Sequence, residues 1–224
     1  MKKIIKSYIK NNPLIIKYFL RYYNRVCGRN RIRIPFKNHC DLGAVLIKKT
    51  RFKISGHGNV IVIKDFSRLT DCDIYIHGND NKIWIDGWTH LNAVRLSIED
   101  DHNEITIGDH TTIYGYTHLS LIEGTSIKIG ANCLFSGDVY FRTGDSHAIV
   151  DLSGQRLNKS EPIIIGDHVW IGTKVIVLKG AQIGNNCVVG AGSLVNKKFN
   201  EENAVLAGTP ARIVKRDINW MHSR

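Results

Sequence analysis

The first candidate for chemistry in this sequence is a histidine in a break of an otherwise periodic chain. His147 lies within residues 141–162, where the rhythm of the flanking segments is lost. Long excursions from a rigid scaffold commonly carry function. An imidazole has an unperturbed pKa of about 6.5, so at neutral pH it can take a proton from a hydroxyl group and return it to a leaving group. We therefore predict that His147 is a general base.

Residue type alone would not single out this histidine, because the chain contains 10 histidines. Considered alone, a histidine in a loop is more often exposed to solvent and without a catalytic role. His147 is distinguished by the excursion and by the string RTGDSH that it ends, residues 142–147. His110 and His168 fall at corner positions of the repeats, and we expect them to be exposed turn residues.

The elements that must position this loop follow a six-residue period on its C-terminal side. Aliphatic residues recur at every sixth position, namely Ile165, Ile171, Val177, Ile183, Val189 and Val195. This period fits neither an α-helix nor an alternating strand. Each hexad predicts a short strand and a tight corner, so three hexads form one triangular coil of a solenoid.

A longer period of 22 residues governs the N-terminal side of the loop. Strings beginning at Ile61, Ile83, Ile105 and Ile127 each have isoleucine at the first and third positions. Three hexads plus four residues account for this length, and the additional residues fall where asparagines precede the next isoleucine pair. We expect them to form a stacked extra bend at one corner. These asparagines are Asn59, Asn81 and Asn103. The two blocks together predict one all-β solenoid of roughly six to seven coils.

The C-terminal hexads resemble the hexapeptide acyltransferase superfamily, most closely its sugar and polysaccharide O-acetyltransferase branch. The resemblance rests on the strings IGDHVW (165–170), IGTKVI (171–176) and AGTPAR (207–212). It implies a left-handed parallel β-helix, and for the 22-residue coils a right-handed β-helix is the alternative. It also implies a homotrimer with active sites between neighbouring subunits.

The resemblance further implies an acetyl-CoA-dependent O-acetyltransferase. His147 stands about eighteen residues before the IGDHVW string, where the family has its catalytic histidine. Direct transfer to a hydroxyl of a bacterial surface polysaccharide or its sugar precursor is the implied reaction. An N-acyltransferase of an amino or nucleotide sugar would share the same motifs. A non-enzymatic β-helix that binds polysaccharide would keep the repeats but would need no His147.

Several residues take implied roles in the site. The positions that match the family's acetyl-CoA groove are Trp170, Gly172, Thr173, Ala191, Asn196, Pro210, Arg212 and Lys215. Trp170 could instead fill a corner of the solenoid. Three charged loop residues could orient His147 or bind the sugar acceptor, or could simply be solvated: Arg142, Asp145 and Asp151.

No metal site is expected from the sequence. The five cysteines form no CxxC pair, and Cys133 and Cys187 occupy small inward positions of their repeats. No set of histidines matches the zinc triad of a related β-helix enzyme.

The positive charge of the chain is concentrated at its N-terminus. Eleven of the 31 Lys and Arg residues precede residue 38, and the first acidic residue is Asp41. Apolar residues recur there at roughly helical spacing, with Pro13 at a helix start and Gly28 at a stop. We expect two basic amphipathic helices in a segment 1–37, followed by the β-helix domain 38–224 with its catalytic loop at about 141–162.

This segment is expected to cap the open end of the solenoid, to contact an anionic membrane through residues 1–26, or both. An anionic polysaccharide is a further partner that the charge would suit. Nucleic acid is not expected, because the segment lacks a recognised binding module. No uncharged run reaches the length of a membrane span and no cleavable signal is evident, so we expect a cytoplasmic protein, free or peripheral at the inner face of the membrane.

Overall fold

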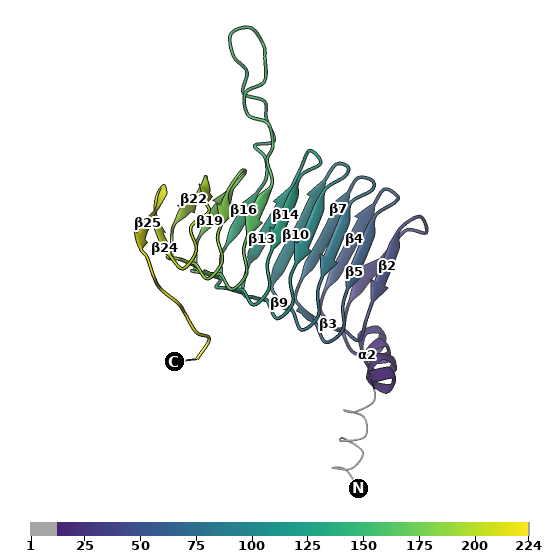
Figure 1. Cartoon of the computed structure of the whole chain (residues 1–224). Helices are drawn as coiled ribbons and strands as arrows, with labels where there is room; N and C mark the ends of the chain where they lie inside the picture. Colours follow the sequence, from purple (N-terminus) through teal and green to yellow (C-terminus); the bar gives the residue numbers. More distant parts are fainter. Residues whose placement is uncertain (1–12, 224) are drawn as a thin grey trace.

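The computed structural model describes residues 13–223 and shows a helix followed by a long parallel β-solenoid (Figure 1). Helix α2 spans Pro13–Val26, and the strands then visit three sheets in turn. Two sheets have eight strands and the third has nine, which makes about eight coils rather than six to seven. The coil that the sequence analysis missed is the first one, where residues 31–48 carry little of the periodic signal.

The strands stack in register along the three sheets, which we name A, B and C. Sheet A comprises β1 (Arg31–Arg33), β4 (Arg51–Ser55), β7 (Asp73–His77), β10 (Val94–Glu99), β13 (Thr117–Leu121), β16 (Tyr140–Arg142), β19 (Ile176–Leu178) and β22 (Leu194–Val195). Sheet B comprises β2 (His39–Leu42), β5 (Val60–Ile63), β8 (Lys82–Ile85), β11 (Glu104–Ile107), β14 (Ser126–Ile129), β17 (Ile163–Ile165), β20 (Gln182–Ile183) and β23 (Lys198–Phe199). Sheet C comprises β3 (Leu46–Lys48), β6 (Arg68–Thr70), β9 (His90–Asn92), β12 (Thr112–Ile113), β15 (Leu134–Phe135), β18 (Trp170–Ile171), β21 (Val188–Val189), β24 (Val205–Gly208) and the antiparallel β25 (Ala211–Lys215).

The same three sheets pass through both sequence periods, so the solenoid has one handedness throughout. Sheet B, for example, runs from β2 to β23 without a break in strand order. The fold is a left-handed β-helix, and the right-handed alternative for the 22-residue coils is wrong.

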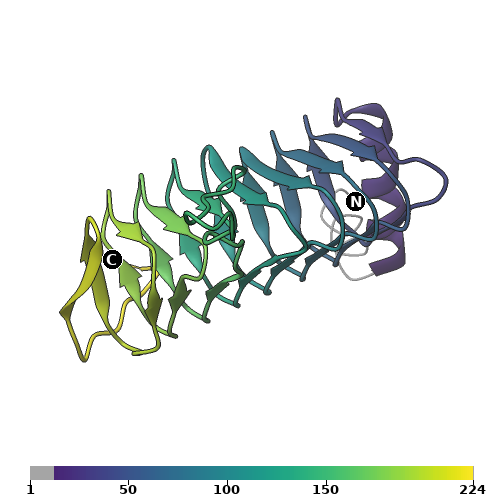
Figure 2. The ribbon, with the colours of Figure 1, turned by 90° about the horizontal axis from the view of Figure 1, so that it is seen from above.

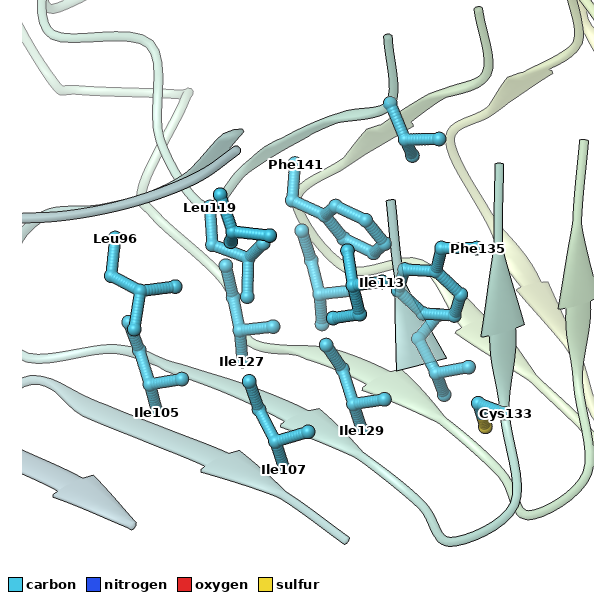
Figure 3. Close-up of a cluster of buried hydrophobic side chains, with 14 of the residues drawn as sticks. Leu96, Ile105, Ile107, Ile113, Leu119, Ile127, Ile129, Cys133, Phe135 and Phe141 are labelled. Carbon is cyan, nitrogen blue, oxygen red and sulfur yellow. The ribbon is translucent and has the colours of Figure 1, made fainter. Parts of the chain in front are cut away.

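The core is a set of ladders formed by residues at equivalent positions of successive coils. Five isoleucines stack in sheet B and are at most 1% exposed: Ile61, Ile83, Ile105, Ile127 and Ile163. Phe135 and Phe141 stack inside with ring centroids 5.6 Å apart (Figure 3). Cys133 lies in the same core, where burial raises the pKa of its thiol to about 11. A thiol of this kind stays protonated and behaves as a small apolar group.

The additional residues of the 22-residue coils lengthen two sides of the triangle. Strands of sheet A have five or six residues from β4 to β13 but only two or three from β16 onward. Strands of sheet B shorten likewise from four residues to two. The expected stacked bend is present at the corner between sheets A and B, over residues 56–58, 78–80 and 100–102. The long strands also take up additional residues, because each points a second residue into the core, as Ile98 and Ile107 do.

The asparagines of the long coils form a buried ladder at the corner between sheets A and B. The Oδ1 atom of Asn59 accepts the backbone N–H of Asn81 at 3.0 Å, and that of Asn81 accepts the backbone N–H of Asn103 at 2.8 Å. The ladder begins at Asn38 and ends at Thr125, whose N–H lies 3.0 Å from Asn103 Oδ1. Each asparagine satisfies the corner backbone of the next coil, which a buried turn requires.

Helix α2 covers part of the open N-terminal end. Asn24 donates its Nδ2 to Val45 O at 2.8 Å and accepts the N–H of Ile47 at 2.9 Å, so it pairs the free edge of β3. This is the capping role expected of the basic segment. The other expected helix lies outside the described residues. Strand β1 already pairs with β4, so the solenoid begins before the boundary at residues 37 and 38.

Candidate active site

The excursion between β16 and β17 projects far from the solenoid (Figures 1 and 2). It takes the place of one corner between sheets A and B, and its arms pair antiparallel at Val150 and Arg156. His147 lies in the first arm and is exposed. The sequence therefore located a true protrusion, and its histidine is exposed to solvent.

The root of the loop is tied to the asparagine ladder. Thr143 is fully buried, and its Oγ1 lies 2.7 Å from Thr125 Oγ1 and accepts the N–H of Ile122 at 3.2 Å. Since Thr125 ends the ladder, the hydrogen-bonded corner continues into the first residue of the loop. The loop thus leaves the scaffold from a fixed point.

Asn158 fastens the two arms of the loop around His147. Its Nδ2 donates to the backbone oxygen of His147 at 2.8 Å and to Asp145 Oδ2 at 2.8 Å. Its Oδ1 accepts the N–H of Ile149 at 2.7 Å. These bonds hold the backbone on the C-terminal side of His147 and the side chain of Asp145 on its N-terminal side, and the sequence analysis did not identify Asn158.

Arg142 and Asp145 have partners within the loop base. Arg142 donates to Gly144 O at 2.8 Å, to Tyr140 Oη at 2.9 Å and to Ser146 Oγ. Asp145 forms an ion pair with Lys179 of the next coil. The hydrogen bond from Lys179, followed by that from Asn158, holds the pKa of the Asp145 carboxyl below its usual range. Both residues therefore support the shape of the loop around His147.

Asp151 lies at the loop tip and organises its turn. Its Oδ1 accepts the N–H of Ser153 and of Gln155, both at 2.9 Å, and the hydroxyl of Ser153 at 2.7 Å. The Ser153 side chain, followed by the Gln155 backbone, lowers the pKa of the Asp151 carboxyl. A role in substrate binding stays a prediction for all three charged residues.

Three of the residues predicted to bind the cofactor stack at one corner, between sheets C and A, and Pro210 lies at the same end of sheet C in the turn from β24 to β25. Gly172 and Thr173 follow β18, Ala191 follows β21, and Pro210 follows β24 after a cis peptide bond. A Cβ atom on Gly172 would lie 2.7 Å from the backbone nitrogen of Ala191, so only glycine fits there. Thr173, Ala191 and Pro210 are exposed at this corner, which we call the glycine corner, whereas Gly172 is buried.

The other predicted cofactor residues are more dispersed. Trp170 lies on the outer face of sheet C, 39% exposed, with its ring centroid 6.1 Å from that of Trp220. Arg212 and Lys215 are exposed on β25 at the C-terminal edge of that sheet. Asn196 instead follows β22 at the corner between sheets A and B, which is the loop's corner. Within one chain, the structure therefore separates Asn196 from the glycine corner.

A polar cluster on the outer face of sheet A escaped the sequence analysis. His118 Nε2 lies 3.0 Å from Ser97 Oγ, which also accepts Arg95 Nε at 3.0 Å, and the His118 ring meets Tyr140 edge-on. Burial, reinforced by the Arg95 charge, lowers the pKa of His118 to about 4. Arg95 and His118 line a hollow of about 690 Å³ together with Tyr116. Only the register of the strands brings these residues together, so no local motif could have revealed them.

Within residues 13–223, no three His, Cys, Asp or Glu side chains gather as a metal-binding group. No helix of this range is both long and apolar enough to cross a membrane.

Comparison with known proteins places the chain among acetyltransferases. Residues 162–197 match the model of the family "Bacterial transferase hexapeptide (six repeats)". A polysialic acid O-acetyltransferase of Neisseria meningitidis is 34% identical over 176 residues, which are 78% of this chain and 81% of that protein. A galactoside O-acetyltransferase of Lactococcus lactis is 39% identical, but only over 49% of this chain and 52% of its own length.

Solved structures give the same result at the level of the fold. The polysialic acid-specific acetyltransferase NeuO has a TM-score of 0.78 at 28% identity, over 87% of this chain and 88% of its own. The polysialic acid O-acetyltransferase OatWY has a TM-score of 0.75 at 31% identity, over 88% and 91%. The chain therefore belongs to the hexapeptide-repeat acyltransferases, in the branch of sugar and polysaccharide O-acetyltransferases.

Proposed function

We propose that the protein transfers an acetyl group from acetyl-CoA to a hydroxyl of a bacterial surface polysaccharide or its sugar precursor, with His147 as general base. The observation that carries this proposal is the exposed His147 on a loop in which Asn158 bonds the His147 carbonyl, the Ile149 N–H and the Asp145 carboxylate. The similarity to polysaccharide O-acetyltransferases over most of the chain supports the same reaction class.

The reaction we propose is a direct transfer. His147 removes the proton of the acceptor hydroxyl while the oxygen attacks the thioester carbonyl, and the proton then goes to the departing thiolate. Backbone N–H groups would stabilise the oxyanion. The buried thiols Cys133 and Cys187, whose pKa values are raised by burial, are poor nucleophiles and are given no role.

The acetyl-CoA site we propose runs along the corner of Gly172, Thr173 and Ala191, with Trp170 beside it. Asn196, at the loop's corner, would contact the cofactor only from a neighbouring subunit. Pro210, Arg212 and Lys215 would hold the adenine and phosphate end, since guanidinium and ammonium groups suit phosphate. No metal takes part in this scheme. For the acceptor, we propose the hollow beside His118 and Arg95, on the face between the two corners.

We also propose a homotrimer. In one chain the His147 loop and the glycine corner lie at different corners of the solenoid, separated by sheet A. A neighbouring subunit would bring one loop against another subunit's cofactor corner. Size-exclusion chromatography with light scattering should then give three times the chain mass of 25.3 kDa.

The decisive experiment supplies acetyl-CoA and a panel of bacterial glycans, and locates any new acetyl group by mass spectrometry and NMR. His147→Ala should lower kcat by about 100- to 10,000-fold while acetyl-CoA still binds. His110→Ala, at an exposed corner far from the loop, is the matched control and should retain full activity. Full turnover by His147→Ala would rule out His147 as the general base. Acetylation of an amine alone would show that the reaction is N-acyl transfer rather than O-acetyl transfer.

A further inference from the structure

We propose that α2 is an anchor for an anionic membrane surface, in addition to capping the solenoid. Its sequence PLIIKYFLRYYNRV divides into three sectors at about 100° per residue. One sector faces the coils, one is aromatic and exposed, and one is basic. This inference does not depend on the proposed reaction.

The sector that faces the coils is already occupied. Asn24 pairs the edge of β3, and Leu20 lines a small hollow with Phe66 and Trp88 of the neighbouring coils. Capping therefore accounts for this side of α2 only.

The aromatic sector is exposed and does not face the coils. Its members are exposed to an unusual degree for large apolar side chains: Tyr18 69%, Phe19 58%, Tyr22 64% and Val26 57%. Aromatic rings with a polar edge favour the boundary between lipid headgroups and acyl chains. The i, i+4, i+8 spacing of Tyr18, Tyr22 and Val26 keeps them on one continuous stripe.

The basic sector lies next to this stripe. Lys17, Arg21 and Arg25 follow one another along α2, and no described residue forms an ion pair with either arginine. Arg21 and Arg25 line a hollow of about 460 Å³ at the open end, which Asp41 also borders. The sequence adds four lysines before residue 13 and no acidic residue before Asp41. Positive charge beside an aromatic stripe is the pattern of a helix that lies in an anionic interface.

A second exposed apolar side chain lies at the same end of the solenoid. Phe36, in the first coil between β1 and β2, is fully exposed and is followed by Lys37. In Figure 1 the His147 loop rises on the opposite side from α2. Contact through α2 would therefore leave the loop free.

A second copy of the chain is the competing occupant of this stripe. Packing α2 against another α2 would bring Lys17, Arg21 and Arg25 close to their own copies, and like charges repel. A membrane rich in phosphatidylglycerol instead supplies the complementary charge. A soluble anionic polymer would satisfy the arginines but would leave the aromatic rings in water.

The test uses the full chain and sedimentation with vesicles of phosphatidylcholine alone or mixed with phosphatidylglycerol. The wild type should bind the mixed vesicles at least tenfold better than the neutral ones. The double variant Arg21→Gln, Arg25→Gln should bind about 25-fold more weakly, since each charge near the surface contributes about fivefold. The triple variant Tyr18→Ser, Phe19→Ser, Tyr22→Ser should lose binding by at least tenfold.

The control variant is Tyr114→Ser, Tyr116→Ser, which removes two exposed aromatic rings, 50% and 81% exposed, from a different corner of the solenoid. It should bind vesicles like the wild type. Circular dichroism and chromatography check that each variant keeps its fold and mass. Unchanged vesicle binding by the aromatic triple variant would overturn the proposal, as would a fall in oligomer mass caused by that variant without lipid.

Discussion

The coils before and after the His147 loop use the same three sheets but are held together differently. The earlier coils have long strands and a buried asparagine ladder at the corner between sheets A and B, whereas the later coils have short strands and a small buried residue such as Ala181 at that corner. Asn81 is fully buried at its corner, while Lys197 is exposed at the equivalent corner of a later coil. In the early half, asparagine side chains therefore bond the backbone of this corner from coil to coil, whereas the later half has exposed residues such as Lys197 there.

The loop lies at the junction between these two halves. The ladder ends at Thr125, which bonds Thr143 at the loop root, and the first hexad coil begins directly after the loop. Lys179 of that coil pairs with Asp145. His147 thus stands between a rigid hydrogen-bonded block and the block with the glycine corner.

Breaking the ladder should give the largest effect on stability. In Asn81→Ala, the N–H of Asn103 and the carbonyl of Asp100 lose partners that now lie at 2.8 and 2.9 Å. A buried unsatisfied group costs about 1–3 kcal/mol, so we expect a loss of about 4 kcal/mol including the cavity. Guanidinium unfolding at fixed protein concentration measures it.

The matched variant for this comparison is Asn185→Ala in a later coil. Asn185 accepts the N–H of Asp167 at 2.8 Å but is only half-buried, so water can replace it. We expect a loss of about 1 kcal/mol there. Equal losses at the two positions would show that the halves do not differ in the way their corners are held.

Crowding the glycine corner should be the next largest effect, and should act on the later half. Gly172→Ala places a Cβ 2.7 Å from the Ala191 nitrogen and 2.9 Å from Val189 O, so backbone must move, at a cost of about 1–3 kcal/mol. We also expect a raised KM for acetyl-CoA, because Ala191 shifts. Gly87→Ala in an early coil meets only Asp65 O at 3.0 Å and the Lys64 Cβ, and is the control. A cofactor KM unchanged in Gly172→Ala would argue against a site at this corner.

Removing the Asn158 hydrogen bonds from the His147 loop should test the role of the junction between the two halves. Asn158→Ala removes the bonds to His147 O, Asp145 and the Ile149 N–H, so we expect kcat to fall about tenfold through misplacement of His147, with little change in acetyl-CoA KM. Gln155→Ala, at the exposed tip, should be silent. Partial recovery of kcat in Asn158→Asp, which keeps the Ile149 acceptor, would separate positioning from general loss of fold.

The sequence predicted the regular parts of this molecule and missed those that depend on register. The hexads and the 22-residue strings specify the core, because inward residues such as Ile105 and Ile171 recur at fixed spacing. The loop was found as a gap in that spacing. The first coil was missed because its strands are short and partly exposed, as β1 is along its whole length. The roles of Asn158 and Lys179 could not be predicted, since a loop that folds back on the next coil leaves no periodic trace.

The smallest predicted effect concerns a row of residues in register on sheet A, which are polar in the early coils and apolar in the later coils. His118 pairs in register with Arg95 before it and with Tyr140 after it, and Tyr140 then pairs with Ile176. The folded pKa of His118 is about 4, against about 6.5 in an unfolded chain. Between these values the unfolded state binds more protons, so lowering the pH from 6.5 to 4 should destabilise the fold, and no penalty should exist above pH 6.5.

We expect this penalty to reach about 1 kcal/mol after allowance for the partial exposure of the ring. The measurement is the difference in unfolding free energy between wild type and His118→Gln at pH 7 and pH 4.5, which cancels the carboxylates common to both proteins. The variant should lose less stability on acidification. If wild type and His118→Gln lost the same stability on acidification, the His118 ring would be hydrated in solution. The early half of the row would then respond to pH no more than Ile176 does in the later half.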